Sequence, residues 1–122
     1  MDKKYITNEN MGDKVPDICG TAIELINSSL AGSKKLSIAI ILIEPGMKST
    51  MHFHKKTEEV YYILEGIGEI YIDTFKSKIV KGDTILIPIG LKHQIINNNS
   101  SLLKFISIDA PIFEEDDVFI CE

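Results

Sequence analysis

The chain has 122 residues, of which 44% are hydrophobic and 25% are charged, and its formal net charge is −5. This length and composition predict one globular domain with a single hydrophobic core. The negative charge disfavours nucleic acid and anionic membranes as partners, because both attract basic proteins.

The sequence favours a cytoplasmic protein. Its longest apolar stretch, Ile38–Ile43, is far too short to span a bilayer. The first ten residues lack the apolar segment of a secretory signal. The two cysteines, Cys19 and Cys121, form no C-x-x-C pair, and isolated thiols are typical of a reducing compartment.

The first 35 residues give only a weak pattern. Pro16 and Gly20 favour a short irregular or helical lead-in, and Ala22–Ile26 fits either an edge strand or a short helix. No tertiary arrangement follows from this part alone.

Six short runs rich in β-branched and aromatic residues follow, separated by Gly, Pro or Asn-rich turn signals. Their ranges are Leu36–Ile43, Glu59–Leu64, Ile67–Phe75, Thr84–Ile87, His93–Asn97 and Leu102–Ile108. The segments between them are too short for the helices that a parallel sheet requires. The pattern therefore predicts an all-β sandwich or barrel.

Residues 110–122 form the C-terminal end, which contains four consecutive acidic residues, Glu114–Asp117. Short runs of like charge are usually solvated, so we expect an acidic tail on the surface. A lid over a substrate or a contact with a partner is the alternative.

The chain contains only three histidines, His52, His54 and His93. His52 and His54 are two residues apart, so in an extended strand both would point to the same face. Imidazole and carboxylate groups together suit Mn, Fe, Ni, Co, Cu or Zn. Three histidines and one carboxylate would leave two positions of an octahedral ion open for a substrate. We therefore predict one divalent transition metal per chain.

Two segments around these residues resemble the two motifs of the cupins. The first motif, G-x5-H-x-H-x(3,4)-E-x6-G, reads here Gly46-MKSTM-His52-Phe53-His54-KKTE-Glu59-VYYILE-Gly66. The second, G-x5-P-x-G-x2-H-x3-N, reads Gly82-DTILI-Pro88-Ile89-Gly90-Leu91-Lys92-His93-QII-Asn97. Every fixed position is filled. The resemblance implies a single cupin domain over residues 1–122, folded as a double-stranded β-helix or jelly-roll barrel with its core at about residues 36–109.

The same resemblance implies the metal ligands. His52 and His54 match the paired histidines of the first motif, and His93 matches the histidine of the second. Both Glu58 and Glu59 fit the flexible spacing, but only Glu59 keeps six residues to Gly66. We therefore expect Glu59 to be the ligand and Glu58 to be its solvated neighbour.

Short single-domain cupins of this kind are often described as mannose-6-phosphate-isomerase-like. We expect a metal-dependent enzyme for a small polar metabolite, such as a sugar phosphate or a carboxylic acid, with isomerase- or epimerase-like chemistry. An Fe-, Cu- or Mn-dependent dioxygenase and a non-catalytic small-molecule binding module are the alternatives. A fold does not fix a reaction.

With all three histidines assigned to the metal, acid–base work would fall to other groups. The candidates are Tyr61, expected on the same face as Glu59, and Glu58. Lys48, Lys55, Lys56 and Lys92 surround the ligand segments and could attract an anionic substrate.

We expect a homodimer. The run Leu36–Ile43 is apolar on both faces, which requires burial on both sides. The family resemblance points the same way, because small cupins are commonly dimers.

Overall fold

The computed structural model describes residues 4–121, so residues 1–3 of the expected lead-in and residue 122 lie outside it. Its strands are β1 (Lys14–Asp17), β2 (Gly20–Ile26), β3 (Ser37–Ile43), β4 (His52–Phe53), β5 (Glu58–Glu65), β6 (Ile67–Ile72), β7 (Phe75–Val80), β8 (Thr84–Ile87), β9 (His93–Ile96), β10 (Leu103–Ala110) and β11 (Phe119–Ile120). Two short 3-10 helices, η1 (Glu9–Met11) and η2 (Glu115–Asp117), complete the fold. The predicted all-β class is confirmed. Within residues 4–121 no helix is long and apolar enough to cross a bilayer.

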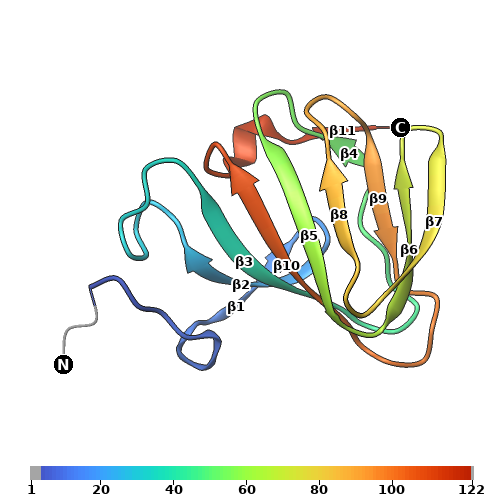
Figure 1. Ribbon diagram of the computed structural model, residues 1–122, viewed down its shortest axis with the longest axis horizontal. Coiled ribbons are helices and arrows are strands. Elements are labelled where there is room, and N and C mark those ends of the chain that lie inside the picture. Colours follow the sequence, from blue (N-terminus) through green and yellow to red (C-terminus); the bar gives the residue numbers. More distant parts are fainter. Residues whose placement is uncertain (1–3, 122) are drawn as a thin grey trace.

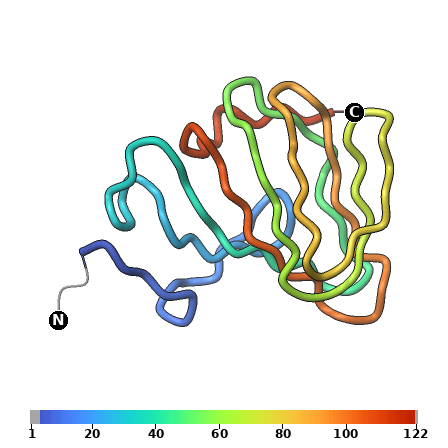
Figure 2. The backbone as a smooth tube through the Cα atoms, in the orientation of Figure 1, coloured from blue at the N-terminus to red at the C-terminus, as the bar shows by residue number. Residues whose placement is uncertain are grey.

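The strands form two antiparallel sheets. One has the order β1-β2-β3-β10-β5-β8, and the other has the order β11-β4-β9-β6-β7. Figure 1 shows the sheets facing each other around a common interior, with β1 and β2 at the side away from β7. From β3 to β10 the chain moves to the other sheet at every connection except the β6–β7 hairpin, a course that Figure 2 traces. This winding is the predicted double-stranded β-helix.

The core follows the period of two along the strands. On β10, Leu103 and Phe105 point inward and are fully buried, and the next inward positions are Ser107 and Asp109. The interior is therefore apolar along one part of β10 and polar along the rest. The polar part lies next to Glu59, because Asp109 pairs directly with Glu59 across β10 and β5.

Two strand predictions need correction. The run Ile67–Phe75 is not one strand, because the chain turns at Asp73 and Thr74 and returns as β7. Asp73 has φ of 53°, a left-handed conformation that Asp tolerates better than most residues. Ala22–Ile26 belongs to β2, which lies between β1 and β3 rather than at the sheet edge. Because half of β7 is polar and Asp-Thr is a weak turn signal, the sequence pattern does not indicate this hairpin.

Candidate metal centre

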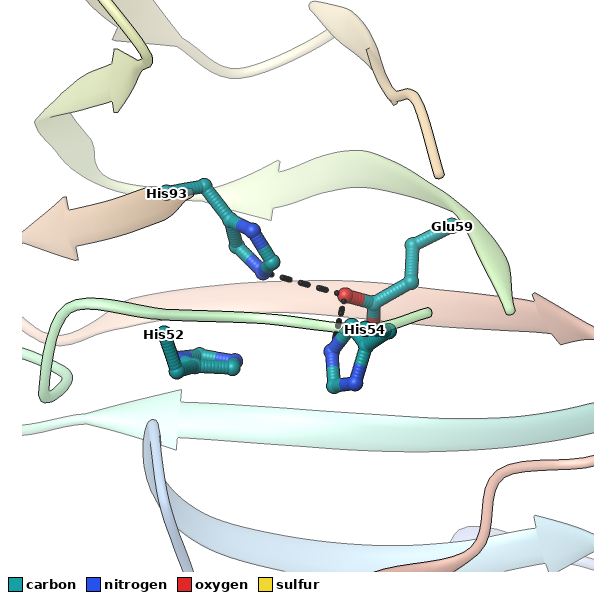
Figure 3. A group of neighbouring side chains, drawn as sticks. All are labelled: His52, His54, Glu59 and His93. Carbon is teal, nitrogen blue, oxygen red and sulfur yellow. Dashed lines mark ion pairs between the residues drawn. The ribbon is translucent and has the colours of Figure 1, made fainter. Parts of the chain in front are cut away.

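The four predicted ligands come from both sheets and point toward one another (Figure 3). His52 on β4 lies directly opposite His93 on β9, and His54 follows β4 immediately. Glu59 projects from β5 in the other sheet. The backbone N–H of Gly90, which has φ of 82°, donates to the carbonyl of His54 at 2.8 Å. This bond ties the turn before His93 to the segment carrying His54.

All four side chains are buried, with exposed fractions of 1% for His52, 3% for His54, 5% for Glu59 and 1% for His93. One nitrogen or oxygen atom from each lies within 4.8 Å of the other three. That spacing is close to what nitrogen and oxygen ligands about 2.1 Å from a common ion would show.

Backbone carbonyls fix the orientation of each imidazole. The Nδ1 atoms of His52, His54 and His93 lie 2.6, 2.8 and 3.0 Å from the carbonyl oxygens of Thr50, Asp117 and Leu91. A carbonyl oxygen can only accept, so each Nδ1 must carry the proton. A neutral ring then has a free lone pair on Nε2, which is the arrangement of metal-ligating histidines.

The Nε2 atoms of His54 and His93 converge on one carboxylate oxygen of Glu59. Glu59 Oε1 lies 2.9 Å from His54 Nε2 and 3.1 Å from His93 Nε2, and all three atoms are buried without a hydrogen-bond partner among the described residues. Lone pairs facing one another in a buried site are unfavourable unless a cation or a proton lies between them. The donor set and its geometry therefore fit a divalent transition metal.

Comparison with known proteins identifies the family to which the chain belongs. A family model described as the cupin domain matches residues 39–109. The chain belongs to the cupin family. The cupin is 36% identical over 99 residues to the uncharacterized protein MJ1618 of Methanocaldococcus jannaschii, and this match covers 81% of the chain and 79% of that protein.

Two solved structures illustrate the shared fold. The polyketide cyclase RemF from Streptomyces resistomycificus has a TM-score of 0.81 at 18% identity, covering 95% of this cupin and 84% of that chain. A sugar phosphate isomerase of the cupin superfamily from Silicibacter pomeroyi has a TM-score of 0.66 at 24% identity, covering 74% and 58%. At these identities the likeness shows the fold alone.

The structure separates the two candidates for acid–base work. Glu58 is exposed on the outer face of β5 and does not face the centre, so it is no longer a candidate. Tyr61 is 1% exposed and lines the cavity beside His52, with its hydroxyl oxygen 4.0 Å from Cys19 Sγ. Burial raises the pKa of Tyr61 well above its ordinary value, so its hydroxyl keeps its proton.

The acidic tail prediction is wrong for Asp117. Its side chain is 4% exposed and accepts hydrogen bonds from the backbone N–H groups of Lys55, Lys56 and Thr57. Its carbonyl accepts from His54. Pairing of β11 with β4 holds the segment in place. The C-terminal segment is therefore part of the support of the metal centre, a role that its charge run does not indicate.

Asp109 is a second site residue that the sequence did not single out. It is 7% exposed, and burial together with the neighbouring Glu59 carboxylate raises its pKa to about 10. Burial opposes the charge of Glu59 itself, but His54 and His93 outweigh it and lower its pKa. The pair thus consists of a carboxylate ligand beside a protonated carboxyl group. The inward polar series Ser107 and Asp109 on β10 was the signal that could have found it.

Metal uptake by this cupin is expected to weaken as the pH falls. Burial lowers the pKa of His54, but contact with the Glu59 carboxylate outweighs it and raises that pKa above 6.5. A proton shared between His54 and Glu59 must therefore leave before a metal binds. For one competing proton the affinity falls about tenfold per pH unit below that pKa. Titration with Zn²⁺ between about pH 8 and pH 6, followed by calorimetry in buffers of different ionisation enthalpy, measures the released proton. An affinity independent of pH would contradict this coupling.

Proposed function

We propose that this cupin is a metal-dependent enzyme that acts on a small polar metabolite, with isomerase- or epimerase-like chemistry. The observation that carries the proposal is the convergence of three imidazole nitrogens and one carboxylate oxygen in a buried site beside a cavity. Four protein ligands leave coordination positions open for a substrate, as reactive metal sites require. A sugar phosphate isomerase of the cupin superfamily shares this fold, so the fold can accommodate such a reaction.

The residues around the centre have distinct tasks. A bound divalent ion would polarise a carbonyl or hydroxyl oxygen of the substrate. Tyr61 lines the cavity and keeps its proton on the phenolic oxygen, so it can donate a hydrogen bond there. Asp109 keeps a proton that it can donate to the neighbouring Glu59 carboxylate. Ser107 Oγ donates to Glu59 Oε2 at 3.3 Å and so orients that ligand.

The first test is metal content followed by proton exchange. Protein prepared without a histidine tag should contain a transition metal by mass spectrometry. With small aldoses and ketoses in D₂O, NMR should detect deuterium entering the carbon next to the carbonyl.

Oxygen consumption with iron-loaded protein and catechol-like or thiol substrates would favour a dioxygenase instead. Tight binding of a metabolite without turnover would favour a binding module, and protein unable to take up any metal would refute the proposal.

The free thiols of the described chain support a cytoplasmic location within this proposal. Cys19 and Cys121 form no disulfide, and Cys19 is buried with a pKa raised well above its ordinary value by burial. Unpaired thiols are typical of proteins from reducing compartments.

We also propose that the cupin forms a homodimer through the outer face of the six-stranded sheet. Strand register places apolar side chains in two adjacent rows across that face. One row contains Leu86, Val60, Ile108 and Ile38, and the other contains Tyr62, Ile106 and Ile40. Leu86 is 53% exposed and Tyr62 is 41% exposed, and the other members of the two rows are half-buried except Ile40, which is buried. Contiguous apolar surface of this kind is typical of an interface.

Tyr62→Lys is expected to reduce the mass in solution from that of two chains to that of one, 13.7 kDa. The new ammonium group would lie beside Ile106 within the proposed interface, where its desolvation is costly. Multi-angle light scattering measures the change. Phe75→Lys is the matched control, because Phe75 is 59% exposed on the other sheet. A monomeric wild type, or a dimer unaffected by Tyr62→Lys, would contradict the proposed interface.

A further inference from the structure

The cavity beside the metal centre is too small for a whole metabolite. His52, His54 and Glu59 contribute to its wall, and its volume is about 30 Å³. One or two groups of the size of a water molecule fill such a space. A sugar or an organic acid must therefore keep most of its length outside this cavity while one end reaches the metal.

A larger groove lies directly outside the cavity. Its volume is about 320 Å³, which is enough for a small metabolite. It is lined by Pro16, Asp17, Ile18, Phe113, Glu115 and Val118. Three of these residues, Asp17, Ile18 and Phe113, also line the cavity, whereas a second groove, beside the N-terminal segment, shares only Glu24 with it. The first groove is therefore the more direct approach to the metal centre.

The boundary between groove and cavity is formed by two segments whose backbones are held in place. The carbonyl of Ile18 accepts from the backbone N–H of Thr50 at 3.3 Å, and the carbonyl of Thr50 holds the ring of His52. The backbone N–H of Phe113 donates to Ser37 Oγ at 3.0 Å. Because both backbones are anchored, the side chains of Ile18 and Phe113 determine how wide a group can pass between groove and cavity.

The ring of Phe113 lies against the metal centre itself. It meets the ring of His54 edge to face, with the ring centres 6.0 Å apart and the planes at 82°. Phe113 and Ile18 are both half-buried, and Ile18 packs against the hydrophobic core. A group that moves from the groove to the metal therefore passes these two apolar side chains.

The lysines that the sequence pointed to do not line this approach. Lys48, Lys55, Lys56 and Lys92 are exposed and line neither the cavity nor the groove. The ammonium group of Lys55 lies over the ring of Phe119, 4.1 Å from its centre. Steric fit at the boundary, rather than attraction by these lysines, then decides which groups reach the metal.

We propose that the substrate lies in the groove and reaches the metal past Phe113, which together with Ile18 limits the width of the group that enters. The passage admits an unbranched end, such as the terminal carbon of an open-chain sugar, and excludes a fully branched carbon. Phe113 is thus a specificity-determining residue. This inference rests on the proposed function, in which one end of the substrate binds an open position of the metal.

The test uses two isomeric thiols, butane-1-thiol and 2-methylpropane-2-thiol, which have the same composition but differ in width. Each is titrated without oxygen into cobalt-loaded full-length protein. A thiolate bound to Co²⁺ produces a charge-transfer band in the near ultraviolet, so the absorbance reports binding at the metal itself. The wild type should bind the straight thiol at least about tenfold more tightly, because even one methyl group too many in a closely fitting pocket costs about that much.

Phe113→Ala should remove most of this preference through tighter binding of the branched thiol, with the affinities for cobalt and for the straight thiol nearly unchanged. Any intrinsic difference between the two thiols is the same in every variant, so the change in the ratio measures the passage. Phe119→Ala is the matched control in the same C-terminal segment. Phe119 lines neither space and stacks on Phe53 with the ring centres 5.3 Å apart, so this variant should keep the wild-type preference.

Ile18→Ala, in the other segment, should also lower the preference, and it decides the question if Phe113→Ala does not fold. The cobalt content of every variant is measured first. A wild type that takes up no cobalt refutes the proposed function and this inference with it. With cobalt bound, the passage alone is overturned by equal affinities for the two thiols in the wild type, or by the absence of a charge-transfer band with either.

The ratios in the variants give the remaining outcomes. A preference that is unchanged in both Phe113→Ala and Ile18→Ala overturns the passage. So does a preference that falls as far in Phe119→Ala as in Phe113→Ala, because loosening of the C-terminal segment would then explain both. Loss of the preference in Phe113→Ala but not in Phe119→Ala supports the assignment.

Discussion

Replacing His93 by alanine is expected to abolish stoichiometric metal binding. His93 Nε2 is buried, has no hydrogen-bond partner within the described chain, and points at Glu59 Oε1 from 3.1 Å. Its ring is already oriented by the Leu91 carbonyl, so the wild type needs little reorganisation to bind a metal. Loss of a residue that only supports a ligand costs about 10–100-fold in metal affinity, and loss of a ligand should cost at least about 100-fold.

Two measurements check this result. Mass spectrometry gives the metal content after dialysis, and thermal unfolding with and without metal gives the stabilisation by binding. The wild type should unfold at a higher temperature when metal is added, and His93→Ala should not. Lys92→Ala is the control, because Lys92 is the exposed neighbour of His93 and should leave both readouts unchanged. Wild-type metal content in His93→Ala would contradict the assigned ligand set.

The same variant separates metal binding from folding. In the metal-free protein, the burial of His52 and its proximity to His93 lower the pKa of His52 to about 4, so His52 is neutral at physiological pH. Removing His93 takes away one of the two imidazoles that face Glu59, while His54 remains beside that carboxylate. His93→Ala without metal should therefore still fold, with a stability below that of the metal-free wild type because the missing ring leaves a cavity. A loss of metal binding in a folded variant then reports on ligation alone.

The ligand positions could be predicted because they depend on local order along the chain. The distance of two residues between His52 and His54 and the choice of Glu59 over Glu58 both follow from strand geometry together with the motif spacing. The structure brings these four side chains together as expected. Asn97, the last fixed position of the second motif, supports the fold, since its Nδ2 donates to the carbonyls of Ile43 and Ser101.

The positions of Asp109 and Asp117 at the site depend on contacts between segments far apart in the chain. The spacing of motif residues along the sequence does not encode such contacts. Asp109 becomes a neighbour of Glu59 only through the register of β10 against β5. Asp117 reaches the segment after His54 from more than 60 residues away along the chain. An acidic residue in a charged run is usually solvated, so the buried member could not be told from the exposed ones.

Asp117→Ala is expected to destabilise the folded protein by about 3 kcal/mol, because several hydrogen bonds to a charged acceptor are lost. The backbone N–H groups of Lys55, Lys56 and Thr57 would then be left without their acceptor. These residues directly follow His54, and the backbone of position 117 holds the His54 ring. Loosening this segment should also lower metal affinity by about tenfold or more.

The pH dependence of stability gives a further check on Asp117. Burial opposes its ionisation, but the three backbone donors outweigh burial and lower its pKa below the ordinary value of 3.8. A carboxyl group whose pKa is lower in the folded state stabilises the protein at neutral pH and loses that contribution as the pH falls through the folded-state pKa. The difference in unfolding free energy between wild type and Asp117→Ala should therefore be full at pH 7 and shrink below about pH 4.

Asp116→Ala provides the matched control, because Asp116 carries the same charge in the same short helix but is exposed. Urea unfolding of both variants without metal, and metal titration of both, separate the contribution of the buried carboxylate from that of general charge. If the two variants lose equal stability, Asp117 acts only as one member of an acidic surface. If Asp117→Ala alone loses both stability and metal affinity, the short helix η2 is a structural part of the metal centre.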